Sequence, residues 1–226
     1  MASGSSQWRG PIADAPTVVD VVSSEAQFRG RVVGVRSDTV KIGDSTVRRD
    51  IVVHPGAVGI IAINDADEIL LLRQLRVPVS AYLFEPPAGL LDKVGEDPLV
   101  AAKRELVEEA GLVAATWHVL VDVYNTPGGS TEAIRVYLAR DLSPAVGGRP
   151  WTGEAEEFDL PTAWVPLAQA CRLVFAGDLM SPLAVIGSMA AAVARDNDWR
   201  DVRPADAPWP VRDHLAAIGN LPATWS

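Results

Sequence analysis

Short runs of alternating apolar and polar residues begin near residue 29, a pattern typical of β-strands. Strand-like runs cover residues 30–36, 39–42 and 46–53, and turn-forming residues separate them. We therefore predict an N-terminal antiparallel β meander over residues 28–55. The preceding segment, 1–27, mixes Gly, Ser, Pro and Asp and is predicted to be a flexible arm.

The strongest apolar run of the chain covers residues 57–63 and predicts a strand buried on both faces. A turn-forming segment follows, so residues 69–72 are expected to run back as the hairpin partner of that strand. The remaining pattern predicts strands at 117–123, 133–138 and 163–165, and helices at 98–110 and 167–194. Strands and helices are mixed without regular βαβ alternation, which indicates an α+β fold with a mixed β-sheet between helices, over residues 56–195. The tail, 196–226, has no assigned role.

The helix expected at residues 98–110 has clear start and stop signals. Asp97 is a favourable N-cap, Pro98 fits the first helical position, and Gly111 suits the left-handed position that ends a helix. Apolar residues recur at helical spacing on one face: Leu99, Ala102, Leu106 and Ala110. The polar chemistry of this helix must therefore lie on the opposite face.

That opposite face is acidic. Glu105 and Glu109 are four residues apart, so their carboxylates lie one turn apart on the same side, with Glu108 beside them. Arg104 offsets part of their charge, and Glu96 adds a carboxylate just before the helix. Carboxylate oxygens are the ligands that Mg²⁺ prefers, so the cluster is a candidate metal site. A solvated acidic helix face is the alternative interpretation.

The segment that contains this helix resembles the Nudix box, a glycine and a glutamate followed by Arg-Glu-Leu-x-Glu-Glu-x-Gly-Leu. The matching positions are Gly89, Glu96, Arg104, Glu105, Leu106, Glu108, Glu109, Gly111 and Leu112. Six residues separate Gly89 from Glu96, where the commoner pattern has five, but the extra residue lies in a loop, where insertions are tolerated. The resemblance extends over about residues 28–195 and implies a Nudix fold.

The resemblance also implies a role for each residue of the cluster. Glu105 and Glu109 would bind the metal directly, together with the main-chain carbonyl of Ala88. Glu108 would be a further ligand or act through a bound water, which makes it a catalytic candidate as well, and Arg104 would orient the glutamates. The implied cofactor is Mg²⁺, with Mn²⁺ as a substitute, because such ions neutralise a diphosphate and activate the attacking water.

Features outside the box resemble the ADP-ribose pyrophosphatase branch of the family. Pro127 lies 15 residues after Leu112, in a Pro-Gly-Gly loop closed by Glu132, which the resemblance makes a substrate-binding residue. Three arginines resemble substrate-binding positions: Arg49, Arg73 and Arg76. Arg76 is the leading candidate for bidentate bonds to phosphate. A simple tight turn at Pro127, and surface positions for Arg49 and Arg73, are the alternative interpretations.

The acidic loop at residues 153–158 resembles the loop that supplies the catalytic base in this branch. Glu156 aligns best with that base by its distance from Phe158, and Glu154 is the second candidate. A base has to reach the attacking water only when substrate is present, so a loop is a suitable carrier. A solvated acidic loop is the alternative.

These features together predict Mg²⁺-dependent hydrolysis of the diphosphate of ADP-ribose to AMP and ribose 5-phosphate. One alternative substrate is another nucleoside diphosphate sugar, such as GDP-mannose or UDP-glucose, because loops set the substrate on this scaffold. An alternative of a different class is a non-catalytic regulatory domain that binds ADP-ribose, although Glu105, Glu108 and Glu109 are all present. The branch also implies a homodimer to which the meander contributes.

Composition narrows the partners further. The formal net charge of −9 over 226 residues argues against a broad nucleic-acid-binding face, so the expected partner is a small-molecule nucleoside diphosphate derivative. The single cysteine, Cys171, permits no intrachain disulfide. No apolar run approaches the ~18 residues of a membrane span and no signal-peptide pattern is seen, so no membrane partner is expected and the predicted location is cytoplasmic.

Overall fold

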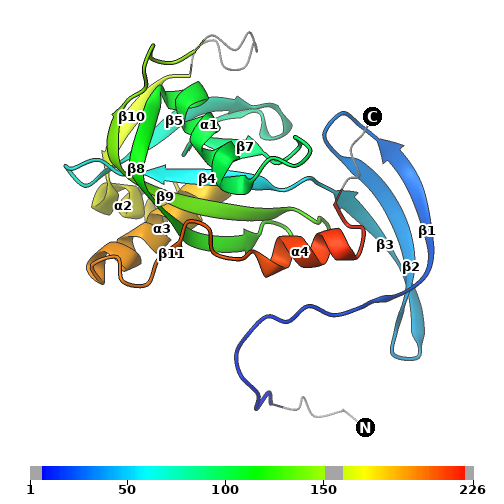
Figure 1. Cartoon of the computed structure of the whole chain (residues 1–226). Helices are drawn as coiled ribbons and strands as arrows, with labels where there is room; N and C mark the ends of the chain where they lie inside the picture. Colours follow the sequence, from blue (N-terminus) through cyan, green and yellow to red (C-terminus); the bar gives the residue numbers. More distant parts are fainter. Residues whose placement is uncertain (1–6, 151–159, 222–226) are drawn as a thin grey trace.

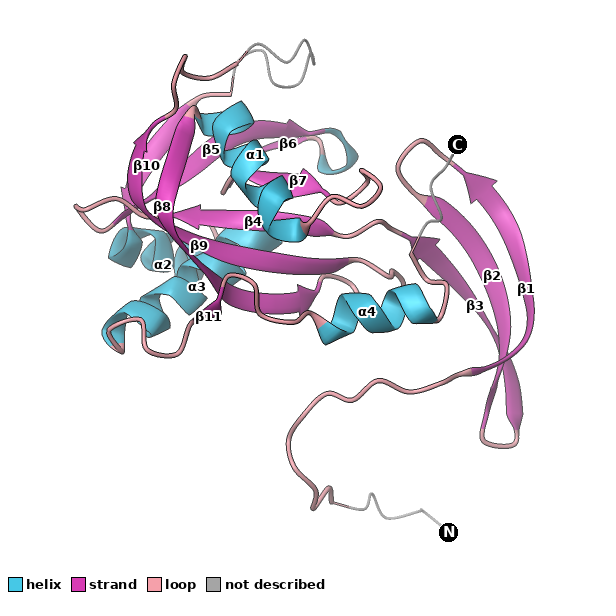
Figure 2. Cartoon of the chain, in the orientation of Figure 1, coloured by secondary structure: helices cyan, strands magenta, loops and turns pink. Residues whose placement is uncertain are grey.

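Three β-sheets and four α-helices make up the part of the chain that the computed structural model describes, residues 7–150 and 160–221 (Figure 1). A three-stranded sheet stands apart at one side, and the remaining elements pack together around a five-stranded sheet (Figure 2). This arrangement confirms the predicted α+β class with an N-terminal meander. Among the described helices, none has the length and apolarity needed to cross a membrane.

The separate sheet is the meander, formed by β1 (Asp20–Arg29), β2 (Gly34–Ile42) and β3 (Ser45–Val53) in antiparallel order. Two expectations about it are wrong. The segment predicted as an arm over residues 1–27 contains most of β1, and β2 runs straight through residues 37–38, where a turn was expected.

Cross-strand hydrogen bonds explain why the turn-forming residues Ser37 and Asp38 lie in a strand. Ser37 Oγ donates to Asp50 Oδ1 at 2.5 Å, and Asp38 accepts from Ser24 Oγ at 2.6 Å and from Arg36 Nε at 3.0 Å. Ser37 and Asp38 are buried, and each has its polar group satisfied by a neighbour. Ser24 and Asp50 come from the neighbouring strands, so the local sequence around residues 37–38 does not reveal these bonds.

The five-stranded sheet has the order β11-β8-β9-β4-β7. Its strands are β4 (Ala57–Ala62), β7 (Ala88–Leu90), β8 (Leu112–Tyr124), β9 (Ala133–Pro144) and β11 (Arg203–Pro204). β4 pairs parallel to β9 and antiparallel to β7, so the sheet is mixed. Every residue of β4 is buried, which confirms the strand predicted at residues 57–63.

The second sheet of the main body consists of β5 (Glu68–Arg76), β6 (Ala81–Glu85) and β10 (Thr162–Pro166), with a 3-10 turn, η1 (Val77–Val79), between β5 and β6. The expected hairpin of residues 57–63 with 69–72 is wrong, because β5 pairs with β6 and β10. Next to the end of β4, a single β-bridge joins Ile63 to Ile69 of β5. The apolar stretch of β5 is buried without lying beside β4, because the two sheets share one core.

Helices cover both faces of the five-stranded sheet (Figure 1). On β4, Val58 and Ile60 belong to the apolar cluster that includes the buried side chains of α1 (Pro98–Ala110). Ile61 belongs to the opposite cluster, which includes residues of α2 (Leu167–Ala176) and α3 (Pro182–Asp196). Alternate residues of one strand thus face different helices, as expected for a sheet between helices.

The helix predicted over residues 167–194 is two helices in the structure. Gly177 adopts a left-handed conformation with φ +80° and ends α2, and Pro182 occupies the first turn of α3. Both residues are well suited to these positions, glycine because it has no Cβ and proline because it lacks an N–H that would need a partner.

The C-terminal segment 203–221, here called the strap, packs against the same face of the sheet as α1. It contains β11 and α4 (Pro210–Ala217), and its Trp209 and Leu215 join the apolar cluster around α1. Arg135 of β9 fixes it by donating to the carbonyls of Ala207 and Pro208, at 2.7 and 2.9 Å. The described part of the tail without an assigned role therefore contributes Trp209 and Leu215 to the core.

Candidate active site

Helix α1 has the ends that its sequence predicts. The Asp97 carboxylate accepts from the amides of Leu99 and Val100 at 2.9 and 3.2 Å, and Gly111 ends the helix with φ +64°. Leu106 and its apolar neighbours are buried against the sheet. Because both ends and the buried face are fixed, the direction of the glutamates on the other face is fixed as well.

The short strand β7 runs directly against the acidic side of α1. A Cβ atom at Gly89 would lie 2.1 Å from Glu105 Oε1, so the Glu105 carboxylate occupies the space that any other residue would fill. One turn further, Glu109 Oε2 accepts from the amide of Ala88 at 2.9 Å. The two glutamates predicted as metal ligands therefore contact adjacent residues of the same strand.

Arg104 forms ion pairs with three carboxylates of the cluster, those of Glu96, Glu105 and Glu108. Its Nε and Nη2 donate to the two oxygens of Glu96 at 2.9 and 3.0 Å. Its Nη1 donates to Glu105 Oε1 and to Glu108 Oε2, both at 2.7 Å. The extra residue between Gly89 and Glu96 has therefore not displaced Glu96 from the cluster, and Arg104 holds Glu105 and Glu108 from one nitrogen.

The electrostatics of the cluster differ from one carboxylate to the next. Burial raises the pKa of Glu105, although the nearby charge and hydrogen bond of Arg104 act in the opposite direction. The hydrogen bond from Arg104 lowers the pKa of Glu96. The same contacts raise the pKa of Arg104, so its guanidinium stays charged. Glu105 is thus a carboxylate that a nearby cation would stabilise.

The donor set of this cluster fits a hard divalent cation, because it consists of carboxylate oxygens beside a glycine cradle. In the described ranges, no three Asp, Glu, His or Cys side chains come together as a metal cluster by themselves. Glu96, Glu105 and Glu108 converge on Arg104 instead. A bound cation would therefore share Glu105 and Glu108 with this arginine.

Two of the predicted substrate arginines are on β5, next to β6, but they are three residues apart and point to opposite faces of the sheet. Arg76 forms an ion pair with the buried Glu85, with Nη2 2.6 Å from Oε2. The guanidinium of Arg73 lies over the ring of Tyr82, 4.0 Å from its centre. Arg49 is on a different sheet, on the exposed side of β3, where it donates to the carbonyl of Arg48.

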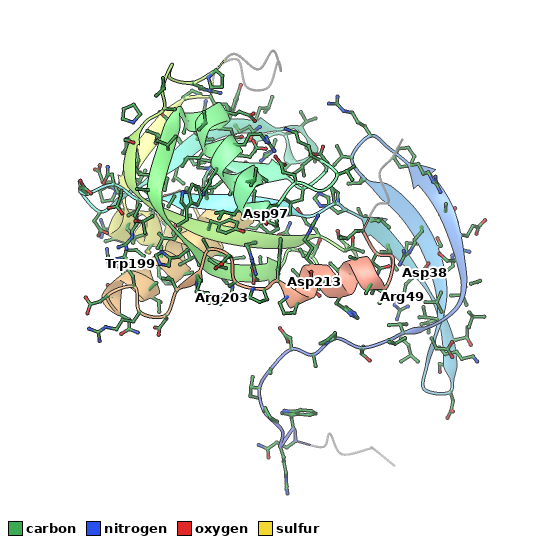
Figure 3. The ribbon with its side chains drawn as sticks, in the orientation of Figure 1. Asp38, Arg49, Asp97, Trp199, Arg203 and Asp213 are labelled. Atoms are coloured by element: carbon green, nitrogen blue, oxygen red, sulfur yellow. The ribbon has the colours of Figure 1, made fainter. Side chains whose placement is uncertain are left out.

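Arg49, labelled in Figure 3, borders a pocket of about 380 Å³ between β3, the loop that contains Pro127, and the strap. Its lining comprises Arg49, Asp50, Ile51, Tyr124, Pro127, Gly128, Gly129, Ser130, Thr131, Leu215 and Asn220. Backbone hydrogen bonds fasten the loop to β3: Val52 N donates to Gly129 O at 2.8 Å, and Thr131 N donates to Val52 O at 3.0 Å. The Pro127 loop is therefore a fixed wall of this pocket.

Glu132, at the end of that loop, has partners from two directions. Its carboxylate accepts from Asn125 Nδ2 at 2.7 Å and lies 3.7 Å from His54 Nε2. His54 Nδ1 accepts from the amide of Gly56, so in the neutral ring Nε2 carries the hydrogen that faces Glu132. Burial lowers the pKa of His54, and the charge of Glu132 opposes this effect.

Sequence reasoning missed His54 as a partner of Glu132, and it missed Leu215 and Asn220 as pocket residues. His54 precedes Pro55 and Gly56, so its sequence context indicates only the end of the meander. The strap carries no motif that points to a site. The predicted base candidates Glu154 and Glu156 lie outside the described residues, so their roles stay predictions.

Comparisons with known proteins match this geometry. A model of the NUDIX domain family matches residues 53–181. The chain is 41% identical over 191 residues to the ADP-ribose pyrophosphatase of Mycobacterium tuberculosis (strain ATCC 25618 / H37Rv), and the match covers 84% of this chain and 90% of that relative. It is 37% identical over 123 residues to the ADP-ribose pyrophosphatase of Bacillus subtilis (strain 168), and this match covers 54% of this chain and 66% of that relative.

The overall fold is also similar to a solved structure. A crystal structure of an ADP compounds hydrolase superposes with a TM-score of 0.68 at 26% sequence identity, and the match covers 83% of this chain and all of that one, 100%. The covered part includes far more than the box segment. The Nudix fold expected from the resemblance is therefore confirmed.

Proposed function

The chain belongs to the Nudix family, and from this premise we propose that it hydrolyses the diphosphate of ADP-ribose to AMP and ribose 5-phosphate. The observation that carries the proposal is the contact of Glu105 and Glu109 with Gly89 and Ala88, which brings the acidic face of α1 onto β7. The choice of substrate is supported by the 41% identity to an ADP-ribose pyrophosphatase over most of both chains.

In the proposed enzyme, Glu105, Glu109 and the carbonyl of Ala88 hold Mg²⁺, with Mn²⁺ as a substitute and Glu108 as a further ligand or a partner through water. When bound, the metal supplies neutralisation of the diphosphate and a lowered pKa for the attacking water. The protein's own contribution is to fix the carboxylates before substrate arrives. Arg104 does so for Glu105 and Glu108 through the hydrogen bonds of its Nη1.

We assign substrate binding to two groups of residues, the arginines of β5 and the residues around the pocket at the Pro127 loop. Arg76 offers a bidentate fork to a phosphate, which would compete with Glu85 for it, and Arg73, on the opposite face of β5, is the second arginine of this strand. Arg49 borders the pocket at the Pro127 loop, and Glu132 supports this loop through its bond to Asn125. The general base is Glu156, with Glu154 as the second candidate, because a base is needed only after substrate binds.

The test is product analysis with ADP-ribose, with and without Mg²⁺, beside GDP-mannose and UDP-glucose. We expect metal-dependent release of AMP from ADP-ribose, faster than cleavage of either sugar nucleotide. Faster cleavage of a sugar nucleotide would keep the chemistry and replace the substrate. Binding of ADP-ribose without cleavage would replace the enzyme by a regulatory domain.

The variant Glu109→Gln tests the metal site within the same assay. It removes a proposed ligand charge while keeping the shape of the side chain, so we expect a rate lower by roughly two to three orders of magnitude. Circular dichroism of the variant should match that of the wild type. Equal turnover by the two proteins would remove Glu109 from the proposed site.

A further inference from the structure

The pocket at the Pro127 loop has a third wall that lies beyond the resemblance, which ends near residue 195. Leu215 of α4 and Asn220, just after that helix, border the pocket together with Arg49 and Ile51 of β3. Figure 1 shows α4 lying between the five-stranded sheet and the meander. The strap is therefore placed to shape a site that the other two walls leave open.

Separate contacts fix the strap to both sides of this site. On the side of the sheet, Arg135 holds the carbonyls of Ala207 and Pro208, and Leu215 is buried. At the joint between the sheet and the meander, Arg212 Nη1 donates to the carbonyl of Pro55 at 2.7 Å. A wall held in this way keeps its position, which a selective site requires.

On the side of the meander, Asn220 makes the contact. Its Oδ1 accepts from Arg36 Nη2 at 2.5 Å, and Arg36 Nε also donates to Asp38. In the register of β2 and β3, Arg36 pairs with Ile51 and Asp38 pairs with Arg49. Directly paired residues of adjacent strands point to the same face, so Asn220 is bonded to the sheet face that carries two pocket residues.

The chemistry of the lining fits a nucleoside better than a diphosphate. Its charged side chains are Arg49 and Asp50, whose charges offset each other. Tyr124 offers an aromatic ring, and Ile51 and Leu215 offer apolar surface for a base. The segment from Ile51 to Gly59, which pairs with Ala88 next to the acidic cluster, joins the two places and spans at most ~28 Å.

We propose that the strap forms a wall of the nucleoside subsite. In this proposal Asn220 is a positioning residue. It acts through Arg36 and keeps the meander face that carries Arg49 and Ile51 at the mouth of the pocket. This inference rests on the proposed hydrolysis of a nucleoside diphosphate derivative and adds the part of the substrate that the strap selects.

The experiment measures binding of AMP and of ribose 5-phosphate to the full chain by calorimetry, for the wild type, Asn220→Ala and Asn220→Asp. Asn220→Ala loses the bond to Arg36, so the Kd for AMP should rise about 3- to 10-fold while that for ribose 5-phosphate is unchanged. Asn220→Asp keeps an acceptor for Arg36 and should bind AMP within about two-fold of the wild type. Ala216→Ser is the matched control. Ala216 is exposed on α4, the helix just before Asn220, and the variant should bind as the wild type does.

Kinetics provide the second measurement. In Asn220→Ala the KM for ADP-ribose should rise with kcat within about two-fold, because the lost contact acts on binding and not on the reacting phosphates. Unchanged AMP binding in Asn220→Ala, or Asn220→Asp as weak as Asn220→Ala, would overturn the proposal. A wild type that binds AMP but does not cleave ADP-ribose would overturn the proposed function alone, because the calorimetry needs no turnover.

Discussion

At the scale of single residues, the site depends on one missing side chain. Glu105 can reach β7 because residue 89 has no Cβ, and in this position its carboxylate also accepts from Arg104. The sequence identifies Gly89 as part of a motif, but its physical reason is visible only once helix and strand are placed together. The glycine and the glutamate therefore act as one unit.

The substitution Gly89→Ala tests this unit. The added methyl group overlaps the Glu105 carboxylate, so we expect Glu105 to be displaced and kcat to fall about 100-fold. Gly59→Ala is the control, because a Cβ there is also crowded, at 2.9 Å, but meets the end of the Leu183 side chain and not a carboxylate of the cluster. It should lower stability and leave the Mg²⁺ concentration for half-maximal rate unchanged, whereas Gly89→Ala should raise that concentration.

A second residue-scale prediction concerns His54 and pH. Burial lowers the pKa of His54 in the folded protein, so the unfolded chain binds more protons below the ordinary histidine pKa of about 6.5. The free energy of unfolding should therefore fall as the pH drops through this range. In His54→Gln the loss between pH 7.5 and 5.5, measured by urea unfolding, should be smaller. His214→Gln keeps His54 and should show the loss of the wild type; a His54→Gln profile identical to both would contradict the argument.

At the scale of elements, the sequence predicts best where the signals are local. The ends of α1 are set by Asp97, Pro98 and Gly111, all within a turn of the boundaries they define, and the prediction is confirmed at both ends. The break between α2 and α3 also had local signals, Gly177 and Pro182, but the continuous apolar periodicity outweighed them.

Other elements depend on partners far away in the chain. β1 is exposed at every position and has no buried stripe to reveal it; its structure comes from pairing with β2. The strap is fixed by Arg135, about 70 residues earlier, so its own residues carry no signal. Of the candidate site, the acidic cluster could be predicted because one helix and one adjacent strand supply it. The pocket could not, because three distant segments supply its walls.

The cap of α1 gives a prediction at this scale. Asp97→Ala leaves the amides of Leu99 and Val100 without their acceptor, so the protein should lose about 0.5–2 kcal/mol of unfolding free energy in urea titrations. Asp97→Ser keeps an acceptor and should recover most of the loss. A full loss in Asp97→Ser would mean that Asp97 acts through its charge and not as a cap.

At the scale of the whole molecule, the meander presents a surface that the described chain does not cover. β1 is the edge strand of its sheet, and the exposed apolar side chains there include Val21, Val22 and Phe28, with 47%, 56% and 57% of their surface accessible. An edge strand with exposed apolar side chains is a template for association. We therefore propose that β1 contributes to a contact between two copies of the chain, the homodimer implied by the family resemblance.

The substitution Val22→Glu tests this contact. It places a charge near the start of β1, where it would be buried against the second copy without a partner, so the dimer should dissociate. Light scattering should give twice the chain mass, about 48 kDa, for the wild type, and the 24.1 kDa of a single chain for the variant. Val193→Glu, on α3 with 68% of its surface accessible, is the control and should stay dimeric. A wild type that is monomeric at micromolar concentration, or a dimer that Val22→Glu leaves intact, would show that β1 is not the contact, and the meander would then serve only as the wall of the pocket beside the strap.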